Sequence, residues 1–205
     1  MRSHPLAELK QEPAGLRSGD GHVDSATLAS LCRARRILVL GSSGAGKSHL
    51  SRRLREILGL DPINLDDHFW LPDGRPRGDR EWRKLAAGLA ARDSWIMDGT
   101  YERSLDLRIP RSDAIILLEC PAALCLERVL QRERQNPSRQ WLTRSGESPK
   151  RIDRHHVQYV VHYASTTRPA VLASIERHGR GKTLTVLQVP EAVEPFLSKL
   201  RRFAA

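Results

Sequence analysis

The chain has 205 residues, of which 40% are hydrophobic and 28% charged, a length that suits one globular domain rather than two. Its 34 Lys and Arg residues outnumber its 24 Asp and Glu residues, and the formal net charge of +10 favours a polyanionic partner, whether nucleic acid, an acidic membrane surface or a phosphorylated small molecule. No apolar run approaches the roughly 20 residues of a membrane span and the first thirty residues carry no apolar secretory segment, so we expect a cytoplasmic protein with no membrane partner.

The N-terminal region differs from the rest of the chain in its patterning. Residues 1–25 mix Pro, Gly, Asp and Arg without apolar periodicity, which is typical of poorly ordered chain. One short helix is expected over residues 26–32. We therefore predict a poorly ordered leader over residues 1–35 and one folded domain over residues 36–205.

Predicted strands and helices alternate from there on. The apolar run Arg36–Leu40 favours a strand that is buried on both faces, as in a parallel sheet. Further strands are expected over Pro62–Leu65, Trp95–Met97, Ala114–Leu118 and Thr183–Val189. Helices are expected over Lys47–Leu58, from an N-cap at Asp79 to Arg92, from Pro121 to Gln131, from Lys150 with a break or kink at Pro169, and over Glu191–Phe203. This alternation predicts an α/β fold with a parallel sheet.

The segment between the first predicted strand and helix matches the pattern G-x-x-x-x-G-K-[ST]. Its residues are Gly41, Ser42, Ser43, Gly44, Ala45, Gly46, Lys47 and Ser48. Glycines let such a loop wrap around phosphate with its amide N–H groups pointing inward, and the following helix directs its positive dipole end at the same group. Lys47 is expected to neutralise the β- and γ-phosphates and Ser48 to ligate Mg²⁺. We therefore predict a nucleoside triphosphate and Mg²⁺ as ligands.

GTPases, ATPases and small kinases all bind triphosphates, and two features help to separate them. No N-K-x-D guanine signature follows the loop, which disfavours a GTPase. Asp66 and Asp98 stand at the ends of the next two predicted strands, at the sheet edge that faces the ligand. Carboxylates there can hold Mg²⁺-bound water or accept a proton from a hydroxyl. Asp67 is interpreted as a cap or turn residue instead.

Five segments of the chain resemble a known group of proteins. They are Ile37–Ser48, Leu65–Trp70, Trp95–Tyr101, Leu105–Arg108 and Ala123–Arg132. Together they resemble the bacterial P-loop proteins called DNA topology modulation proteins (FlaR-related), in the adenylate kinase-like branch of P-loop kinases. The resemblance covers residues 36 to 200. It implies ATP as the triphosphate, a three-layer α/β/α fold, a five-stranded parallel sheet of order 2-3-1-4-5 with helices on both faces, and a lid over residues 132–154.

The resemblance also implies roles for single residues. Asp98 would help to order Mg²⁺ and its waters, while Arg128 and Arg132, on one helix face, would contact the adenine and the phosphates. Asp66 resembles the acceptor-side carboxylate of small-metabolite kinases. Residues 188–190 lie where the adenine is usually cradled.

The sequence departs from the group's pattern at several positions. His49 stands next to the loop serine, among the expected nucleotide-binding residues, where the group usually has Thr. Thr100 replaces the Asn of a D-G-N-Y motif. The Pro-Arg pair that follows D-G in adenylate kinases is missing, so Arg103 and Arg108 become the candidates for binding the negative charge of an acceptor.

Several other side chains have two interpretations. Trp70 lines an acceptor pocket or packs in the core, with neither favoured, whereas Trp82 and Trp95 are expected in the core. His155, His156 and His162 lack H-E-x-x-H order and are interpreted as solvent-facing or core histidines rather than metal ligands. Arginines of the lid region would either close over the transferring phosphoryl group or stay solvated. Solvation is favoured for Arg134 and Arg139. The lid arginines are Arg132, Arg134, Arg139, Arg144, Arg151 and Arg154.

Two classes of function follow from these features. The first is a kinase that uses Lys47, Asp66, Asp98 and Arg132 to transfer the γ-phosphoryl group of ATP to a small acceptor, which is a nucleoside, a nucleotide or another metabolite. The second is a nucleic-acid-associated ATP-binding protein or ATPase, favoured by the net charge but by no nucleic-acid-binding motif. The kinase is ranked first, as a monomer or a homodimer.

Overall fold

The computed structural model describes residues 23–135 and 152–205. The strands are β1 Arg36–Gly41, β2 Pro62–Asn64, β3 Trp95–Asp98, β4 Ala114–Glu119 and β5 Thr183–Gln188. The helices are α1 Ser25–Arg33, α2 Lys47–Leu58, α3 Asp66–Phe69, α4 Asp79–Ala90, α5 Leu105–Arg108, α6 Ala122–Gln135, α7 Arg154–His162, α8 Thr167–His178 and α9 Val193–Ala204. Two short 3-10 turns cover Glu102–Ser104 and Ile109–Arg111.

The five strands form one parallel sheet of order β2-β3-β1-β4-β5, so the predicted fold class and strand order are confirmed. In the register of the sheet, Val39 of β1 lies between Asp98 of β3 and Ile116 of β4. The carboxyl ends of β1, β3 and β4 therefore meet at one edge. In an open parallel sheet this is the edge where ligands bind.

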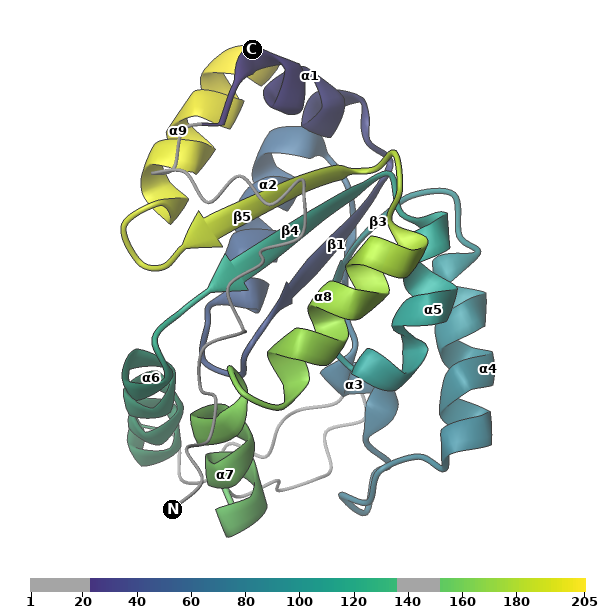
Figure 1. Ribbon diagram of the computed structural model, residues 1–205, viewed down its shortest axis with the longest axis vertical. Helices are drawn as coiled ribbons and strands as arrows, with labels where there is room; N and C mark the ends of the chain where they lie inside the picture. Colours follow the sequence, from purple (N-terminus) through teal and green to yellow (C-terminus); the bar gives the residue numbers. More distant parts are fainter. Residues whose placement is uncertain (1–22, 136–151) are drawn as a thin grey trace, which may run out of the picture.

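Alternate residues of β1 face two separate hydrophobic layers. Ile37 and Val39 pack with Leu50 of α2 and Phe196 of α9 on one face, whereas Leu38 and Leu40 pack against the second layer, which includes Trp82, Leu105 and Val171. Figure 1 shows α1, α2 and α9 on the first face and α4, α5 and α8 on the second. Because both faces are covered, the central positions of β1 need apolar residues, and this explains the unbroken apolar run from Ile37 to Leu40.

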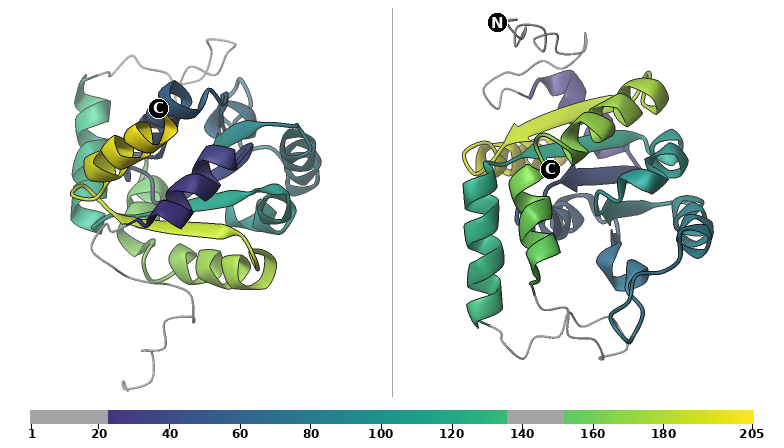
Figure 2. Two further views of the ribbon diagram at one scale, coloured as in Figure 1. Left: turned by 90° about the horizontal axis from the view of Figure 1, so that it is seen from above. Right: turned by 60° about the horizontal axis from the view of Figure 1, so that its bottom comes forward.

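Helix α1 is part of this packing. It is one residue longer at each end than the helix expected over residues 26–32, and the Asp24 carboxylate caps it by accepting from the Thr27 amide at 2.8 Å. Its Leu28 and Leu31 are buried in the same cluster as α9, beside which it lies (Figure 2, left). The packed domain therefore begins before residue 36.

Several predicted helix boundaries differ from those in the structure, and two of the differences concern a cap and a break. The N-cap of α4 is Gly78, and Asp79 is the first helical residue. The long helix predicted from Lys150 is divided into α7 and α8 by residues 163–166, ahead of Pro169. Pro169 itself lies in the first turn of α8. Proline is tolerated there because the first N–H groups of a helix have no partner within the helix.

Helices α6 and α7 lie side by side beyond the carboxyl ends of the strands (Figure 2, right). Most of the predicted lid, with Arg139, Arg144 and Arg151, lies outside the described residues. Arg132 and Arg134 are in the last part of α6, and Arg154 begins α7. None of the helices in the described ranges is both long and apolar enough to cross a bilayer.

Candidate active site

The loop that joins β1 to α2 has the backbone shape that its glycines predict. Gly44 has a φ of 84°, in the left-handed region, and a Cβ there would lie 2.3 Å from the carbonyl oxygen of Cys125 in α6. Gly46 also has a positive φ and precedes the first residue of α2, Lys47. The loop therefore lies directly against α6, with the N-terminal end of a twelve-residue helix beneath it.

The Lys47 side chain curls back over this loop. Its ammonium donates to the carbonyl oxygens of Gly41 at 3.1 Å and of Ser42 at 2.9 Å. Burial lowers the pKa of Lys47, while the nearby carboxylates of Asp98 and Asp66 act in the opposite direction. The structure thus brings Lys47, Asp66 and Asp98 into one cluster, and their roles toward phosphate stay a prediction.

Asp98 ends β3 and is 4% exposed. Burial raises the pKa of Asp98 to about 6, and the Asp66 charge acts in the same direction. The Lys47 charge and a hydrogen bond from Ser48 lower the pKa. The described residues contain no cluster of three His, Cys, Asp or Glu side chains able to hold a metal. The Ser48 hydroxyl and the Asp98 carboxylate nevertheless form a pair that fits Mg²⁺. Bound Mg²⁺ usually keeps several waters and is also coordinated by phosphate oxygens.

The raised pKa of Asp98 predicts a pH dependence of stability. The folded chain keeps this proton where the unfolded chain has lost it, so the contribution of Asp98 to stability falls as the pH rises from the ordinary value of 3.8 to about 6 and is constant above that range. Asn at position 98 cannot titrate. The difference in free energy of unfolding between Asp98→Asn and the wild type should therefore shift in favour of the variant by on the order of 2–3 kcal/mol as the pH rises from 3.8 to about 6. Denaturant titrations of both proteins between pH 4 and pH 8 measure the difference; a gap independent of pH would contradict it.

Asp66 opens α3 and is held by Tyr101. The Tyr101 hydroxyl donates to Oδ1 of Asp66, and the pKa of Tyr101 is raised well above its ordinary value, first by burial and next by the Asp66 charge, so this hydroxyl remains a donor. Tyr101 has a left-handed φ of 36° and lies against the rings of Phe69 and Trp82, with centroids 4.6 Å and 4.9 Å away. Backbone strain of this kind persists where the surroundings enforce it.

Trp70 belongs to the same aromatic cluster, defined here as Phe69, Trp70, Trp82 and Tyr101. Its ring meets Phe69 edge to face at 4.9 Å, and its side chain is among the neighbours that act on the pKa of Tyr101. The indole is half-buried. Trp70 therefore belongs to the cluster that surrounds Tyr101, the residue that holds Asp66, and the buried Trp82 packs against Phe69 and Tyr101.

Thr100 connects the D-G-T-Y segment to the phosphate-binding loop. Its hydroxyl donates to the Gly41 carbonyl at 2.7 Å and accepts from the Gly41 amide at 3.1 Å. Thr100 is 4% exposed, so neither Gly41 group has water as a ready substitute. The residue that departs from the related motif thus fastens the end of β1 to the end of β3.

Loss of this hydroxyl is expected to destabilise the fold. Thr100→Val keeps a similar shape but leaves the buried Gly41 amide without its acceptor, which costs about 1–3 kcal/mol of unfolding free energy. Thr185→Val is the matched control, because the buried Thr185 hydroxyl has no hydrogen-bond partner in the described part of the chain and Val suits a strand. Chemical denaturation of the two variants checks the contrast; equal effects would contradict the role of Thr100.

Arg108 lies elsewhere than the acceptor-binding prediction requires. It is fully buried, and its guanidinium donates to the carbonyl oxygens of Gly99 at 3.0 Å, of Tyr101 at 3.0 Å and of Thr100. Burial lowers its pKa to about 9. Arg108 therefore holds the backbone that follows Asp98, and its donors are directed at that backbone rather than into an open pocket.

Arg103 is exposed on the turn between β3 and α5. Its carbonyl oxygen accepts from Arg83, which also forms a two-pronged ion pair with Asp106, at 3.0 Å and 2.7 Å. The structure thus brings the backbone of Arg103 to α4 and leaves its side chain exposed. The role of Arg103 on the acceptor side stays a prediction, whereas the donors of Arg108 are taken up by backbone carbonyls.

The α6 arginines approach the loop from the other side. Arg128 lies 3.5 Å from the Gly44 carbonyl and 4.0 Å from the Cys120 sulfur. Arg132, one turn further along the helix, is exposed, and its charge is one of the causes that lower the pKa of Lys47. His49 points elsewhere, toward Glu194 of α9 at 3.9 Å.

One contact of the loop falls on a residue interpreted from the sequence as solvent-facing or core. Nε2 of His156, in α7, lies 3.0 Å from Oγ of Ser43, the third residue of the loop. Nothing in the sequence pattern points to this pairing, because the two residues are 113 positions apart. His156 is spaced three and seven residues from Tyr159 and Tyr163, which places the three on one helical face but does not identify the partner of His156.

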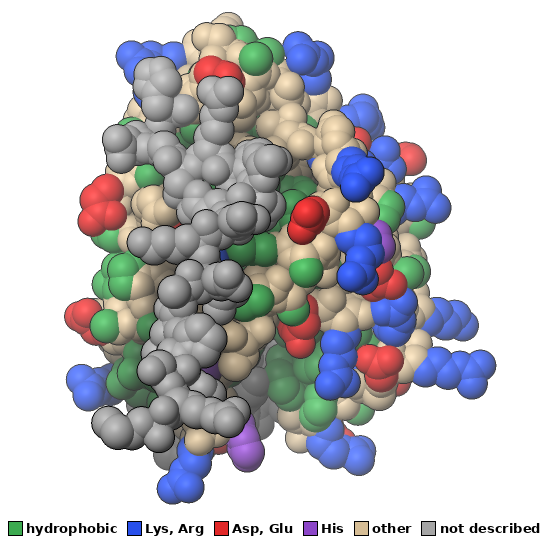
Figure 3. All heavy atoms as spheres, in the orientation of Figure 1, with side chains coloured by type: hydrophobic (Ala, Val, Ile, Leu, Met, Phe, Trp, Pro, Cys, Tyr) green, Lys and Arg blue, Asp and Glu red, His purple; other side chains and the backbone are tan. Residues whose placement is uncertain are grey.

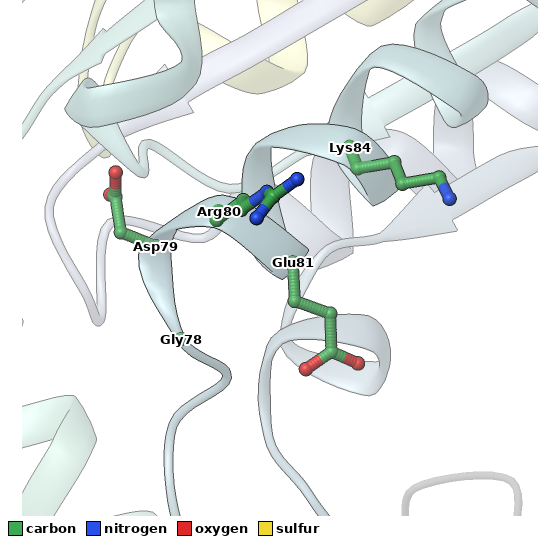
Figure 4. Close-up of a pocket in the computed structure, with 5 residues that line it drawn as sticks. All are labelled: Gly78, Asp79, Arg80, Glu81 and Lys84. Carbon is green, nitrogen blue, oxygen red and sulfur yellow. The ribbon is translucent and has the colours of Figure 1, made fainter.

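A hollow of about 540 Å³ lies away from this cluster, at the start of α4. It is lined by Gly78, Asp79, Arg80, Glu81 and Lys84, whose side chains diverge from one another in Figure 4. None of these residues belongs to the loop, to Asp66 or to Asp98. The side chains do not converge on a common point, so no chemistry is assigned to the hollow.

Comparisons with known proteins support the fold alone. No protein-family model and no curated protein matches the sequence. Among solved structures, the chain is similar to the shikimate kinase from Acinetobacter baumannii in complex with shikimate, with a TM-score of 0.57 and 16% sequence identity, over 84% of this chain and 94% of that chain. The chain therefore has the α/β fold of a P-loop kinase. The finer resemblance to the topology modulation group stays a prediction.

Proposed function

We propose that the protein is an ATP-dependent kinase that transfers the γ-phosphoryl group to a hydroxyl of a small acceptor. The observation that carries this proposal is the cluster at the carboxyl edge of the sheet, where Lys47 covers the glycine-rich loop and Asp98 and Asp66 lie beside it. Phosphoryl transfer needs little covalent chemistry from a protein beyond positioning and charge neutralisation. This cluster has residues of the types needed for both tasks.

The residues divide between the two substrates. The loop amides and the α2 N-terminus would bind the β- and γ-phosphates of ATP, and Lys47 would exchange its bonds to the Gly41 and Ser42 carbonyls for phosphate oxygens. Ser48 and Asp98 would hold Mg²⁺, which would supply further neutralisation of phosphate charge. Arg128 and Arg132 approach the loop from α6, on the side proposed for the rest of the nucleotide.

On the acceptor side, Asp66 is the proposed base. The acceptor hydroxyl oxygen forms a bond to the γ-phosphorus, the bond from that phosphorus to the β–γ bridging oxygen breaks, and ADP leaves. The hydroxyl proton passes to the Asp66 carboxylate, which Tyr101 holds in place.

The net charge of +10 keeps a nucleic-acid-associated ATP-binding protein as the second hypothesis. On the face shown in Figure 3, Lys and Arg side chains are interspersed with Asp and Glu along the edge of the molecule. Several described arginines are paired with carboxylates, including Arg83 with Asp106 and Arg168 with Glu119. A dispersed charge of this kind favours general attraction over a built nucleic-acid surface.

An acceptor screen tests the proposal. ADP formation by the full chain with Mg²⁺ and ATP is followed alone and then with pools of nucleosides, sugars and hydroxy acids, and with duplex DNA. At least one small-molecule pool is expected to raise turnover about ten-fold or more above intrinsic hydrolysis, since correct positioning of an acceptor is the larger part of such catalysis. Stimulation by DNA alone would favour the second hypothesis, and no stimulation by any pool would contradict the kinase.

A further inference from the structure

One face of α7 lies across the carboxyl edge of the sheet. His156 and Tyr159 share this face with Tyr163, the residue that directly follows α7. The ring centroids of His156 and Tyr159 are 6.4 Å apart and those of Tyr159 and Tyr163 are 5.9 Å apart. Tyr163 is 6% exposed, whereas His155, the neighbour of His156 in the chain, is exposed to solvent. The helix therefore presents an ordered row of side chains to the site and turns His155 away from it.

His156 is the residue of this row that meets the phosphate-binding loop. Its Nε2 atom is 3.0 Å from the Ser43 hydroxyl, and the contact is partly buried. The helix end that carries His156 is itself fixed, because the His156 amide donates to the Asp153 cap at 2.7 Å. The imidazole therefore reaches Ser43 from a capped first turn.

Ser43 lies between two residues of the loop that other parts of the chain contact. Gly41, before it, is fastened by Thr100, and the carbonyl of Gly44, after it, faces Arg128 at 3.5 Å. Between them, the Ser43 side chain contacts His156 of α7, 113 positions further along the chain. The shape of such a loop matters because its amides must converge on one anion, and a preorganised site avoids the ordering cost at binding.

We propose that His156 is a positioning residue which, through its hydrogen bond to Ser43, holds the phosphate-binding loop in the shape that receives the triphosphate. This inference rests on the proposed function. His156 acts through Ser43 and takes no proton in the transfer. Its loss should therefore weaken the binding of ATP and raise the KM for ATP, with a smaller effect on kcat.

A double-mutant cycle on the full chain tests the inference. Equilibrium binding of Mg-ATP is measured for the wild type, His156→Ala, Ser43→Ala and the double variant. Each single change is expected to weaken binding about five-fold, which corresponds to one hydrogen bond, and the double variant should bind no more weakly than either single variant. His156→Gln, which keeps a hydrogen-bonding group, should recover most of the loss.

His155→Ala is the matched control, since it removes an exposed imidazole from the same turn and should leave binding unchanged. Effects that multiply in the double variant, or an equal loss in His155→Ala, would overturn the role of His156, as would unaltered binding in all the His156 and Ser43 variants. A wild-type chain that binds no Mg-ATP would instead contradict the proposed function itself. Unfolding curves of each variant without nucleotide confirm that the folded protein is being compared.

Discussion

Lys47→Ala is expected to abolish ATP-dependent turnover, with a fall in kcat/KM of at least about a hundred-fold, the usual cost of removing one preorganised group that neutralises developing charge. In the structure its ammonium lies on the Gly41 and Ser42 carbonyls, over the loop and beside Asp98. Alanine leaves the loop in place but removes the cation that would meet the β- and γ-phosphates. Steady-state kinetics with Mg-ATP and the best acceptor measure the loss.

The folded state should survive this change. Burial lowers the pKa of Lys47, which shows that the enclosed charge is costly, so its removal is not expected to destabilise the protein strongly. Lys84→Ala, at an exposed lysine of α4, is the control for a general loss of positive charge. If Lys47→Ala kept wild-type kcat/KM, or if Lys84→Ala fell as far, the loop would not be the site of the chemistry.

Arg108→Met is expected to have the largest effect on stability, about 3 kcal/mol or more of unfolding free energy. Met fills much of the volume but donates nothing, so the carbonyl oxygens of Gly99, Thr100 and Tyr101 lose a buried donor. Arg108→Lys should recover only part of this loss, because an ammonium cannot reproduce the planar fork. Chemical denaturation of the three proteins gives the values.

Arg103→Met is the control on the neighbouring turn, where an exposed side chain is replaced and the change should stay within about 0.5 kcal/mol. The two possible roles of Arg108, binding an acceptor or holding the backbone, predict opposite effects of Arg108→Met on stability. If Arg108 bound an acceptor, Arg108→Met would keep its stability and raise the KM for that acceptor. If it holds the Gly99–Tyr101 backbone, stability falls first and activity falls with it.

The phosphate-binding loop and the strands of the sheet could be predicted because each depends on residues that are close together in the sequence. A strand buried on both faces needs a continuous apolar run such as Arg36–Leu40, and a phosphate-binding loop needs its glycines and lysine at fixed spacing. Asp66 and Asp98 were predictable for a related reason, since the ends of parallel strands must meet at one edge. The clustering of Lys47 with these two carboxylates in the structure agrees with that reasoning.

Contacts that depend on tertiary folding could not be predicted in this way. An arginine near a site can bind a ligand or hold the backbone, and Arg108 does the latter because α5 turns it inward, next to three carbonyl oxygens. The bond between His156 and Ser43 joins residues 113 positions apart, and no pattern in either segment indicates it. Thr100 stands out from the sequence only as a departure from a motif, whereas its two bonds to Gly41 are visible in the fold.

The fate of the γ-phosphoryl group tests the central claim most directly. ATP labelled with ³²P at the γ-position is incubated with the protein, Mg²⁺ and the acceptor pool that raises turnover most, and the products are separated into inorganic phosphate and organic phosphates. The label is predicted to appear in a small organic phosphate, in an amount equal to the ADP formed above the intrinsic rate, and to be absent with Lys47→Ala. Label found only in inorganic phosphate, with every pool tested, would show hydrolysis without transfer and would contradict the proposed kinase.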